Sequence, residues 1–297
     1  MPSVEIALGD RSYPVMISPG LLADGGAWRP VIGQPSKILV VSNEVVAPLY
    51  LDRLCASLEG LHLDTLVLPD GEETKNFDTW TRIIDRLVDM QAGRDACLLA
   101  LGGGVTGDLC GFAAATYMRG VAYIQVPTSL LAQVDAAIGG KTGINHPQGK
   151  NLVGAFHQPL AVMADTAALE TLPRRHFVAG LAEVVKYGAI RDPGFLQWLE
   201  QHSAEIGERE PDCLGRVIET CVRNKAEVVA ADELEAGQRA LLNFGHSFGH
   251  ALESVTGYQK YLHGEAVSIG MVIAATLSEA HGLCPPGTAQ RLSALLS

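Results

Sequence analysis

The sequence predicts an α/β domain, with a parallel sheet covered by helices on both faces, followed by an all-helical domain. Two observations support this prediction. Through the first half of the chain, short runs rich in Val, Ile and Leu alternate with amphipathic segments, which is typical of βαβ units. After residues 160–163 the strand pattern stops, and apolar residues recur at helical spacing. We place the boundary between residues 168 and 169, which gives domains of residues 1–168 and 169–297.

The composition narrows the class of protein. A length of 297 residues is enough for two domains, each with its own core. The net charge is −11 and the 22 Lys and Arg residues form no cluster, which argues against nucleic acid as a partner. Six scattered cysteines without a C-x-x-C pair indicate reduced, structural thiols. The sequence shows neither a leader peptide nor an apolar stretch near the roughly 20 residues of a membrane span, so we expect a soluble, cytoplasmic protein.

The elements of the first domain are predicted in chain order. Residues 4–8 and 13–17 alternate apolar and polar positions around a Gly9-Asp10 turn, which predicts a hairpin at the edge of a sheet. Four apolar runs then follow as strands, at residues 38–41, 63–68, 96–101 and 122–126. The helices between them are expected to run as far as residue 56, over 77–90 and over 130–138.

A glycine-rich segment follows the third of these strands. Gly102, Gly104 and Gly107 fit G-x-G-x-x-G between a strand and a helix, where the backbone can approach a pyrophosphate at the helix N-terminus. The motif alone also fits a tight structural turn, because the acidic residue expected about 20 positions later is missing. Polar turns also follow other strands, at residues 70–75 and 127–129. Because loops at the carboxyl ends of parallel strands converge, the three turns together favour a nucleotide site in a Rossmann-like domain.

Two lysines lie in glycine-rich loops, Lys141 within residues 139–145 and Lys150 within residues 149–154. Such loops suit anions, and the alternative is that both lysines are solvated side chains of flexible loops. Residues 139–142 resemble the end of a Walker A motif, but Ala136 occupies the position of its required glycine. We therefore reject a P-loop.

The second domain is predicted from helical spacing, with helices at residues 179–190, 195–199, 214–230, 238–254 and 263–280. In the first of them, Glu183 lies three residues before Lys186 among apolar neighbours. A buried Glu is costly without a cation, so Glu183 requires Lys186 or a metal, and a plain i, i+3 salt bridge is the alternative. Lys225 also fits a solvated helix face. Arg239 points toward the histidines described next if its helix is continuous.

Three histidines gather within 18 residues. His246 and His250 are four residues apart, on one face of a predicted helix, and His263 begins another helical segment with Glu265 two residues later. Neutral imidazoles are good ligands for zinc, and a catalytic zinc takes three protein groups, one of which can be a carboxylate. The alternative is that one or two of these histidines are hydrogen-bonded core residues. The pattern leaves all three open as ligands.

From about Asp70 to Ala280 the sequence resembles the 3-dehydroquinate synthases of the sugar-phosphate cyclase superfamily. The segments that carry the resemblance are Asp70-Gly71-Glu72-x-x-Lys75, Gly102-Gly103-Gly104-Val105-x-Gly107-Asp108, Pro127-Thr128-Ser129-Leu130-Leu131-Ala132-Gln133-Val134-Asp135, Gly140-Lys141, Gly149-Lys150-Asn151, Ala182-Glu183-Val184-x-Lys186-Tyr187-Gly188, Asn243-Phe244-Gly245-His246-x-Phe248-Gly249-His250 and His263-Gly264-Glu265-Ala266-Val267. The resemblance implies a dehydroquinate synthase-like fold, with an NAD-binding α/β domain and an all-α metal- and substrate-binding domain.

The resemblance implies a lyase of the shikimate pathway, which leads to chorismate and the aromatic amino acids. Its reaction converts 3-deoxy-D-arabino-heptulosonate 7-phosphate to 3-dehydroquinate and phosphate, through transient oxidation by NAD, phosphate elimination, re-reduction and intramolecular aldol cyclisation. It also implies a divalent metal, zinc or alternatively cobalt, and a cytoplasmic homodimer. The alternatives are a related sugar-phosphate cyclase, a metal-dependent polyol dehydrogenase and a non-catalytic metal- or nucleotide-binding protein.

The resemblance also implies roles for individual residues. Glu183, His246 and His263 would hold the metal, with His250 beside the substrate and not a ligand. The residues expected to bind NAD are Asp70, Gly71, Glu72, Glu73, Thr74, Lys75, Gly104, Val105, Thr106, Gly107, Asp108, Thr128, Ser129, Lys141, Lys150, Ala168, Leu169, Glu170 and Thr171. The residues expected to contact the substrate are Asp135, Lys141, Asn151, Lys186, Lys225, Arg239, Asn243 and His250, with Arg119 reaching the phosphate across the dimer interface.

Two features depart from the family pattern. His176 stands where the family usually shows an acid, and we expect it behind the site or on the surface. Family members usually continue beyond Ser297 through a segment with a phosphate-contacting lysine, so the helical domain is expected to be short at its C-terminus.

Overall fold

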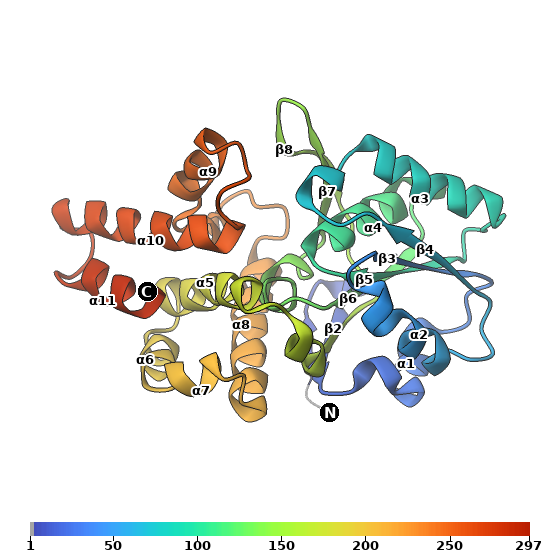
Figure 1. Ribbon diagram of the computed structural model, residues 1–297, viewed down its shortest axis with the longest axis horizontal. Coiled ribbons are helices and arrows are strands. Elements are labelled where there is room, and N and C mark those ends of the chain that lie inside the picture. The colour runs from blue at the N-terminus through green and yellow to red at the C-terminus, as the bar shows by residue number, and fades with distance from the viewer. Residues whose placement is uncertain (1–2) are drawn as a thin grey trace. The chain divides into compact units, whose positions relative to one another are not determined.

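The computed structural model describes residues 3–297, so Met1 and Pro2, on which the expectation of no leader peptide partly rests, lie outside the described residues. The chain forms two compact units that divide after Glu170 (Figure 1). The predicted boundary after residue 168 lies close to this division. The first unit is α/β and the second is helical, which confirms the predicted fold class.

A seven-stranded sheet in the order β1-β2-β9-β6-β5-β3-β4 forms the first unit. β1 (Ser3–Ile6) and β2 (Tyr13–Ser18) form the predicted antiparallel hairpin at one edge, joined through the 3₁₀ helix η1 (Gly9–Arg11). The other strand pairs of this sheet are parallel. The remaining strands are β3 (Ile38–Asn43), β4 (Leu63–Leu68), β5 (Cys97–Gly102), β6 (Ala122–Pro127) and β9 (Ala161–Asp165).

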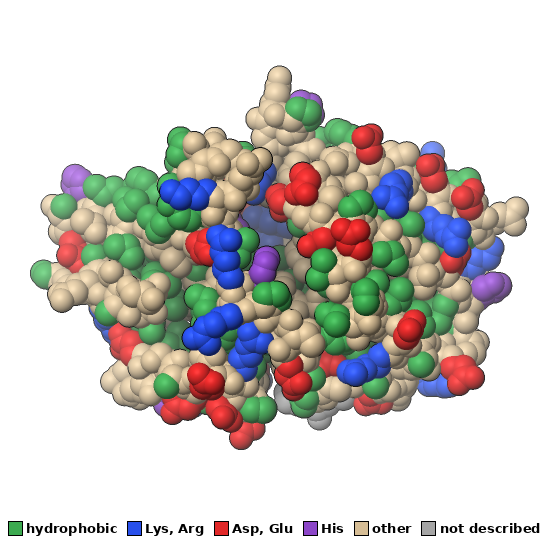
Figure 2. All heavy atoms as spheres, in the orientation of Figure 1, with side chains coloured by type: hydrophobic (Ala, Val, Ile, Leu, Met, Phe, Trp, Pro, Cys, Tyr) green, Lys and Arg blue, Asp and Glu red, His purple; other side chains and the backbone are tan. Residues whose placement is uncertain are grey.

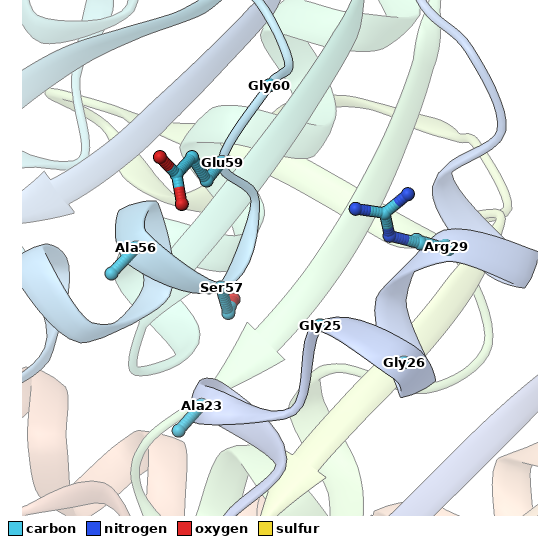
Figure 3. Close-up of a pocket in the computed structure, with 8 residues that line it drawn as sticks. All are labelled: Ala23, Gly25, Gly26, Arg29, Ala56, Ser57, Glu59 and Gly60. Atoms are coloured by element: carbon cyan, nitrogen blue, oxygen red, sulfur yellow. The ribbon is translucent and has the colours of Figure 1, made fainter.

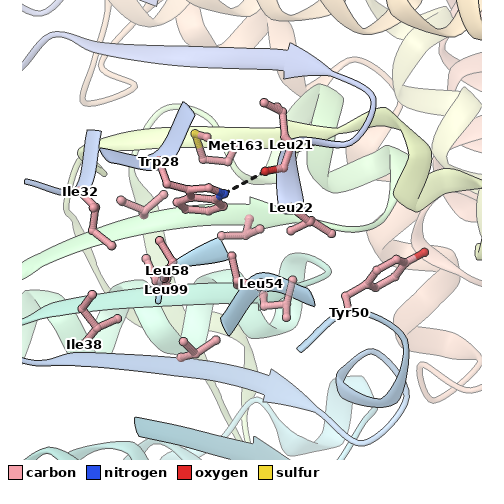
Figure 4. Packing of buried hydrophobic residues seen from close by; sticks show 14 of the residues in the cluster. Leu21, Leu22, Trp28, Ile32, Ile38, Tyr50, Leu54, Leu58, Leu99 and Met163 are labelled. Carbon is pink, nitrogen blue, oxygen red and sulfur yellow. Dashed lines mark hydrogen bonds between the residues drawn. The ribbon is translucent and has the colours of Figure 1, made fainter. Parts of the chain in front are cut away.

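Helices cover both faces of the sheet because its central strands are apolar on both sides. Alternate residues of β3 and β5 pack with α1 (Gly25–Ile32) and α2 (Ala47–Ser57), and the others with α3 (Phe77–Asp89) and α4 (Gly104–Thr116). Figure 4 shows the first core, where the Trp28 ring is buried and its Nε1 donates to Leu21 O at 2.9 Å. Sequence spacing did not predict α1, because its glycines and Pro30 are poor helix formers.

The two lysine-bearing segments are strands, so their prediction as loops was wrong. β7 (Lys141–His146) and β8 (Gly149–Phe156) form an antiparallel hairpin outside the main sheet. Gly143 pairs with Gly154, and a Cβ on either residue would lie 2.6 Å or 2.2 Å from a main-chain oxygen of the facing strand. These glycines therefore permit close pairing. Most of the helix predicted over residues 130–138 is a π-helical turn, η5 (Ala132–Ala136).

The second unit is all-helical, as predicted. Its α-helices are α5 (Arg174–Ile190), α6 (Pro193–Gln201), α7 (Ser203–Gly207), α8 (Pro211–Ala231), α9 (His246–Val255), α10 (His263–Ala280) and α11 (Thr288–Leu296). The continuous helix predicted over residues 238–254 was wrong, because the 3₁₀ helix η7 (Gln238–Asn243) ends before α9 begins. Gly245 makes the break with a left-handed φ of 80°, and a Cβ there would lie 2.5 Å from Met271 Cγ.

The structure can also be compared with the expectations drawn from composition, namely those for the cysteines, the surface charge and a membrane span. All six cysteines are free thiols, as predicted. On the face drawn in Figure 2, acidic and basic side chains of the first unit are interspersed. No helix within residues 3–297 is both long and apolar enough to cross a bilayer. A hollow of about 510 Å³ lies between the start of α1 and the end of α2. Figure 3 labels the residues that line it, and none of them is a predicted site residue.

Close contact between α9 and α10 brings two predicted metal ligands together. Gly270 in α10 lies against the turn before α9, where a Cβ would come within 2.0 Å of Gly245 O. A Cβ at Gly249 in α9 would lie 3.2 Å from main-chain atoms of α10. Because neither glycine carries a side chain, the two helices approach backbone to backbone. His246 and His263, which begin α9 and α10, are held by this contact.

We expect Gly270→Ala to destabilise the protein, because the added methyl group collides with a main-chain oxygen and no rotamer change can relieve the collision. Overpacking of this kind typically costs about 1–3 kcal/mol. Gly215→Ala is the matched control, since Gly215 lies inside α8 and an added Cβ there meets nothing within 4 Å. Alanine should stabilise that helix by up to about 1 kcal/mol. Thermal unfolding midpoints measure both effects, and a Gly270→Ala midpoint at or above that of wild type would show that the contact tolerates a side chain.

Candidate functional site

Polar turns follow the carboxyl ends of the parallel strands β3, β4, β5 and β6 in the first unit. The strand order reverses between β3 and β5, and open parallel sheets bind ligands at such a switch point. α4 begins there at Gly104 without a side-chain cap, so its first main-chain N–H groups donate no hydrogen bond to a capping side chain and suit an anion. Gly107 permits close packing of α4, because a Cβ there would lie 2.6 Å from Gln125 Oε1 of β6.

Several of the residues predicted to bind NAD or substrate contact one another. Lys75 is 4% exposed, forms an ion pair with Asp108, and places its Nζ 2.5 Å from Asn151 Oδ1. Lys150 Nζ lies 3.9 Å from Glu72 Oε1. The structure therefore joins the turn after β4, the start of α4 and the β7–β8 hairpin, which are remote from one another in sequence.

Two asparagines that sequence reasoning missed hold this region together. Asn145 Nδ2 donates to Glu72 Oε1 at 2.7 Å, and its Oδ1 accepts from Asn151 N at 2.9 Å. At the end of β3, Asn43 Nδ2 donates to Asp70 Oδ1 at 2.7 Å. Asn43 could have been predicted from the sequence, because it is a polar residue at the carboxyl end of an apolar strand. The role of Asn145 depends on partners far away in the sequence, so no local pattern marks it.

The other residues predicted to bind NAD, together with Asp135, lie in the first unit, except Thr171, with which the second unit begins. Thr128 N donates to Gly102 O at 2.9 Å, which joins the loops after β5 and β6. The remaining positions are Gly71 in the turn after β4, Glu73 and Thr74 in the 3₁₀ helix η3 (Glu72–Thr74), Val105 and Thr106 in α4, Ser129 after β6, Asp135 in η5, Lys141 at the start of β7, and Ala168, Leu169, Glu170 and Thr171 in the 3₁₀ helix η6 (Thr166–Thr171).

Arg119 lies in a strained turn, η4 (Tyr117–Arg119), between α4 and β6. Met118 and Arg119 have φ values of 48° and 71°, in the left-handed region. Such a conformation costs a non-glycine residue roughly 1–2 kcal/mol, so the surrounding structure must enforce it. The bond from Gly120 N to Tyr117 O at 2.9 Å closes the turn. Arg119 itself is exposed.

Three predicted metal ligands meet in the second unit. Glu183 lies in α5, and His246 and His263 are the first residues of α9 and α10. Both imidazoles direct Nε2 toward one carboxylate oxygen: Glu183 Oε1 lies 3.5 Å from His246 Nε2 and 3.6 Å from His263 Nε2. The other oxygen, Oε2, pairs with Lys186, and both side chains of this pair are 1% exposed.

This donor set fits a divalent metal. Zinc bonds of about 2.0–2.2 Å to nitrogen and oxygen place tetrahedral ligands roughly 3.4 Å apart. The distances of 3.5 Å and 3.6 Å from Glu183 Oε1 to the two imidazoles are close to this value. Two nitrogens and one oxygen also leave the fourth position for a substrate group, as in catalytic zinc sites. The three side chains therefore suit zinc or cobalt without a large rearrangement.

The two imidazoles differ in their electrostatics. Burial lowers the pKa of His246, which keeps this side chain neutral at pH 7 and able to bind a metal. Burial also acts to lower the pKa of His263, but hydrogen bonds to Glu183 and Glu253 outweigh it and raise the pKa to about 9. Because only a neutral imidazole binds a metal, a metal held by His263 has to displace a proton.

His250 lies beside this group of ligands. Its ring centre is 5.5 Å from that of His246 and 5.8 Å from that of His263, and its side chain is exposed. Within the described residues, two groups of three bring ligand atoms within 4.8 Å of one another: Glu183 with His246 and His263, and His250 with Glu253 and His263. His250 therefore belongs only to the second group. Glu253 is a buried neighbour that sequence reasoning missed.

Three of the predicted substrate residues are buried cations. Lys186, Lys225 and Arg239 are 1%, 5% and 1% exposed. In the described part of this unit, Glu183 and Glu253 are the buried carboxylates, so buried cations outnumber buried anions before any histidine is counted. Lys186 pairs with Glu183, and Arg239 interacts electrostatically with Asp232. The three cations nevertheless give the interior of this unit a positive character that suits an anionic ligand.

The loop before η7 sets the position of Arg239, which does not share a continuous helix with the histidines. The Asp232 carboxylate accepts hydrogen bonds from the main-chain N–H groups of residues 239, 236 and 237 at 3.0, 2.8 and 2.7 Å. These bonds lower the pKa of Asp232. Asn243, the last residue of η7, is exposed and its Nδ2 donates to Glu235 Oε1 at 2.9 Å. His176 is exposed on α5, in line with a surface position.

Two family models match the chain: 3-dehydroquinate synthase N-terminal over residues 65–179 and 3-dehydroquinate synthase C-terminal over residues 180–297. The chain is 53% identical over 298 aligned residues to the 3-dehydroquinate synthase of Acidithiobacillus ferrooxidans (strain ATCC 53993 / BNL-5-31), an alignment that covers 100% of this chain and 82% of that protein.

Solved structures of related enzymes resemble the chain closely. One is 2-deoxy-scyllo-inosose synthase complexed with carbaglucose-6-phosphate, NAD+ and Co2+, with a TM-score of 0.92 and 29% identity over 99% of this chain and 80% of that chain. Another is the 2-epi-5-epi-valiolone synthase of Streptomyces hygroscopicus subsp. jinggangensis 5008 with NAD+ and Zn2+ bound, with a TM-score of 0.88 and 33% identity over 98% of this chain and 82% of that chain.

We expect Glu183, His246 and His263 to bind a single divalent ion in each chain. Replacing His263 with Ala removes one of three protein ligands, so the metal content of the purified protein should fall well below that of wild type. Plasma emission spectrometry after dialysis against zinc measures this content. His62→Ala, which alters an exposed histidine of the first unit, is the matched control. Full occupancy in His263→Ala would rule out this ligand set.

Proposed function

The chain belongs to the 3-dehydroquinate synthase family, and from this premise we propose that it converts 3-deoxy-D-arabino-heptulosonate 7-phosphate to 3-dehydroquinate and inorganic phosphate. The observation that carries the proposal is 53% identity over the whole chain to a 3-dehydroquinate synthase. Identity to the two solved cyclases is lower, at 29% and 33%. The comparison therefore favours this substrate over those of the other cyclases. The reaction belongs to the shikimate pathway of aromatic amino-acid biosynthesis.

NAD and a divalent metal are the cofactors of this reaction. The two solved cyclases hold NAD+ together with Co2+ or Zn2+. When bound, NAD accepts and returns a hydride while the metal acidifies a substrate hydroxyl. In this chain Glu183, His246 and His263 would hold the metal, and the turns after β4, β5 and β6 would hold NAD.

The chain's own cations would bind and orient an acidic, phosphorylated substrate. Lys186, Lys225 and Arg239 bring three buried positive charges into the second unit. Because these cations are buried, solvent screens their attraction to a carboxylate or phosphate only weakly. His250 is exposed beside the metal ligands and can accept or deliver a proton there. A polyol dehydrogenase, whose substrate is uncharged, has no use for this set of cations.

We assign the enzyme to the carbon–oxygen lyases, because the reaction eliminates phosphate without net oxidation. We place it in the cytoplasm, in line with its six free thiols. We also propose a homodimer in which Arg119 contacts the phosphate bound by the partner subunit. An exposed arginine in a strained turn supports this role, since such strain persists where the position of a side chain matters for function.

NAD should act catalytically, because the hydride removed from the substrate returns before the product leaves. With protein, zinc, a trace of NAD and excess 3-deoxy-D-arabino-heptulosonate 7-phosphate, inorganic phosphate should accumulate far beyond the NAD present. NADH absorbance should not grow in step with it, and mass spectrometry should identify 3-dehydroquinate as the product. Equal amounts of NADH and product would identify a polyol dehydrogenase. If neither phosphate nor NADH accumulates, the chain is a binding protein without activity. If the product is a different carbocycle, the chain is another cyclase.

Arg119→Ala should lower kcat/KM about tenfold or more, because a charged hydrogen bond to phosphate is worth ~1.5–3 kcal/mol. Arg29→Ala, another exposed arginine of the first unit, is the control. Mixing Arg119→Ala chains with His263→Ala chains should restore part of the activity, since each hybrid dimer keeps one site with all its wild-type groups. Native mass spectrometry counts the hybrids. Hybrid dimers without activity would place Arg119 outside the partner's site.

A further inference from the structure

Glu253 is a buried carboxylate next to the metal ligands, and the reaction described above assigns it no role. It lies in the last turn of α9, is 2% exposed, and places its Oε2 3.5 Å from His263 Nδ1. Glu183 Oε1 lies 3.6 Å from Nε2 of the same ring. The imidazole of His263 is thus held between two carboxylates, one at each nitrogen.

A neutral imidazole has one N–H donor and one lone pair, and its neighbours decide which nitrogen carries which. An ionised carboxylate accepts hydrogen bonds and cannot donate them, so Glu253 favours the hydrogen on Nδ1 of His263. The lone pair then lies on Nε2. This is the nitrogen that faces Glu183 Oε1 and would bind the metal.

His246 shows the same arrangement with a different acceptor. Its Nε2 also faces Glu183 Oε1, at 3.5 Å, and its Nδ1 lies 3.3 Å from Phe244 O. Both histidines therefore present Nε2 to one carboxylate oxygen and Nδ1 to an oxygen acceptor behind the ring. A carboxylate partner raises the basicity of a ligating imidazole, so Glu253 strengthens the bond that the neutral ring of His263 can form to a metal.

We propose that Glu253 is a positioning residue of the metal site, which accepts the Nδ1 hydrogen of His263 and so fixes the tautomer and ring orientation in which Nε2 binds the metal. This inference rests on the proposed metal-dependent function. The competing arrangement is a metal held directly by His250, Glu253 and His263, whose donor atoms also lie within 4.8 Å of one another. The geometry favours the first arrangement, because two rings direct Nε2 at the same buried oxygen of Glu183.

Glu253→Ala and Glu253→Gln test the proposal in the whole chain, after a chelator has removed metal. Competition with a chromophoric chelator measures zinc affinity, and the visible absorption of the Co2+-loaded protein reports the geometry around the ion. Glu253→Ala should weaken zinc binding about 10–100-fold and change the Co2+ spectrum. Glu253→Gln keeps an oxygen that accepts the Nδ1 hydrogen, so its affinity should lie between those of Glu253→Ala and wild type. Ser254→Ala, an exposed neighbour in the same turn, should match wild type.

Thermal unfolding of the metal-free variants separates a folding defect from a loss of ligand positioning. If Glu253→Ala does not fold, the measurements on Glu253→Gln decide the test. Wild-type zinc affinity and an unchanged Co2+ spectrum in both Glu253 variants would overturn the proposal. So would zinc binding that survives Glu183→Ala but not Glu253→Ala, since Glu253 would then be a ligand itself. A wild-type chain that binds neither zinc nor cobalt would overturn the proposed metal-dependent function, and this inference with it.

Discussion

The second unit depends on one buried carboxylate. Glu183 is 1% exposed, and its ionised form is stable there only because positive charge or a metal compensates it. Lys186 supplies a charge from the next turn of the same helix, and His246 and His263 face the other carboxylate oxygen. A buried ion pair of this kind adds little net stability, because desolvation offsets most of the attraction. Its contribution is to fix the direction in which the carboxylate points.

The backbone determines how the two histidines meet that carboxylate. α9 and α10 approach at Gly249 and Gly270, and α10 also approaches Gly245 in the turn before α9. Added side chains would crowd the facing main chain at Gly249 and collide with it at Gly245 and Gly270. Each histidine is the first residue of its helix, so the start of the helix sets the origin of its side chain. The rings are then held from behind by oxygen acceptors at Nδ1. Helix packing and hydrogen bonding thus act in sequence, the first placing each ring and the second orienting it.

Regular elements could be predicted from sequence because their signals are local. The β1–β2 hairpin and α10 over residues 263–280 follow directly from period-2 and period-3.6 patterns. The main errors in the predicted elements occurred at glycines, because the structural role of a glycine depends on atoms that are remote in sequence. Gly143 permits strand pairing with Gly154, and Gly245 breaks a helix against Met271. Sequence spacing also predicted that the histidines form one site. The roles of Asn145 and Glu253 could not be predicted, because only the folded chain brings their partners close.

The three proposed metal ligands come from three helices, α5, α9 and α10, and this has a consequence for the stability of the protein in a cell. An ion bound to all of them cross-links segments between residues 183 and 263, a set that the unfolded chain does not present together. The free energy of binding is then also folding free energy, about 2.7 kcal/mol when free metal is a hundred times its Kd. The second unit would therefore resist proteolysis better when metal is bound. Chains without metal would be degraded faster than chains that hold it.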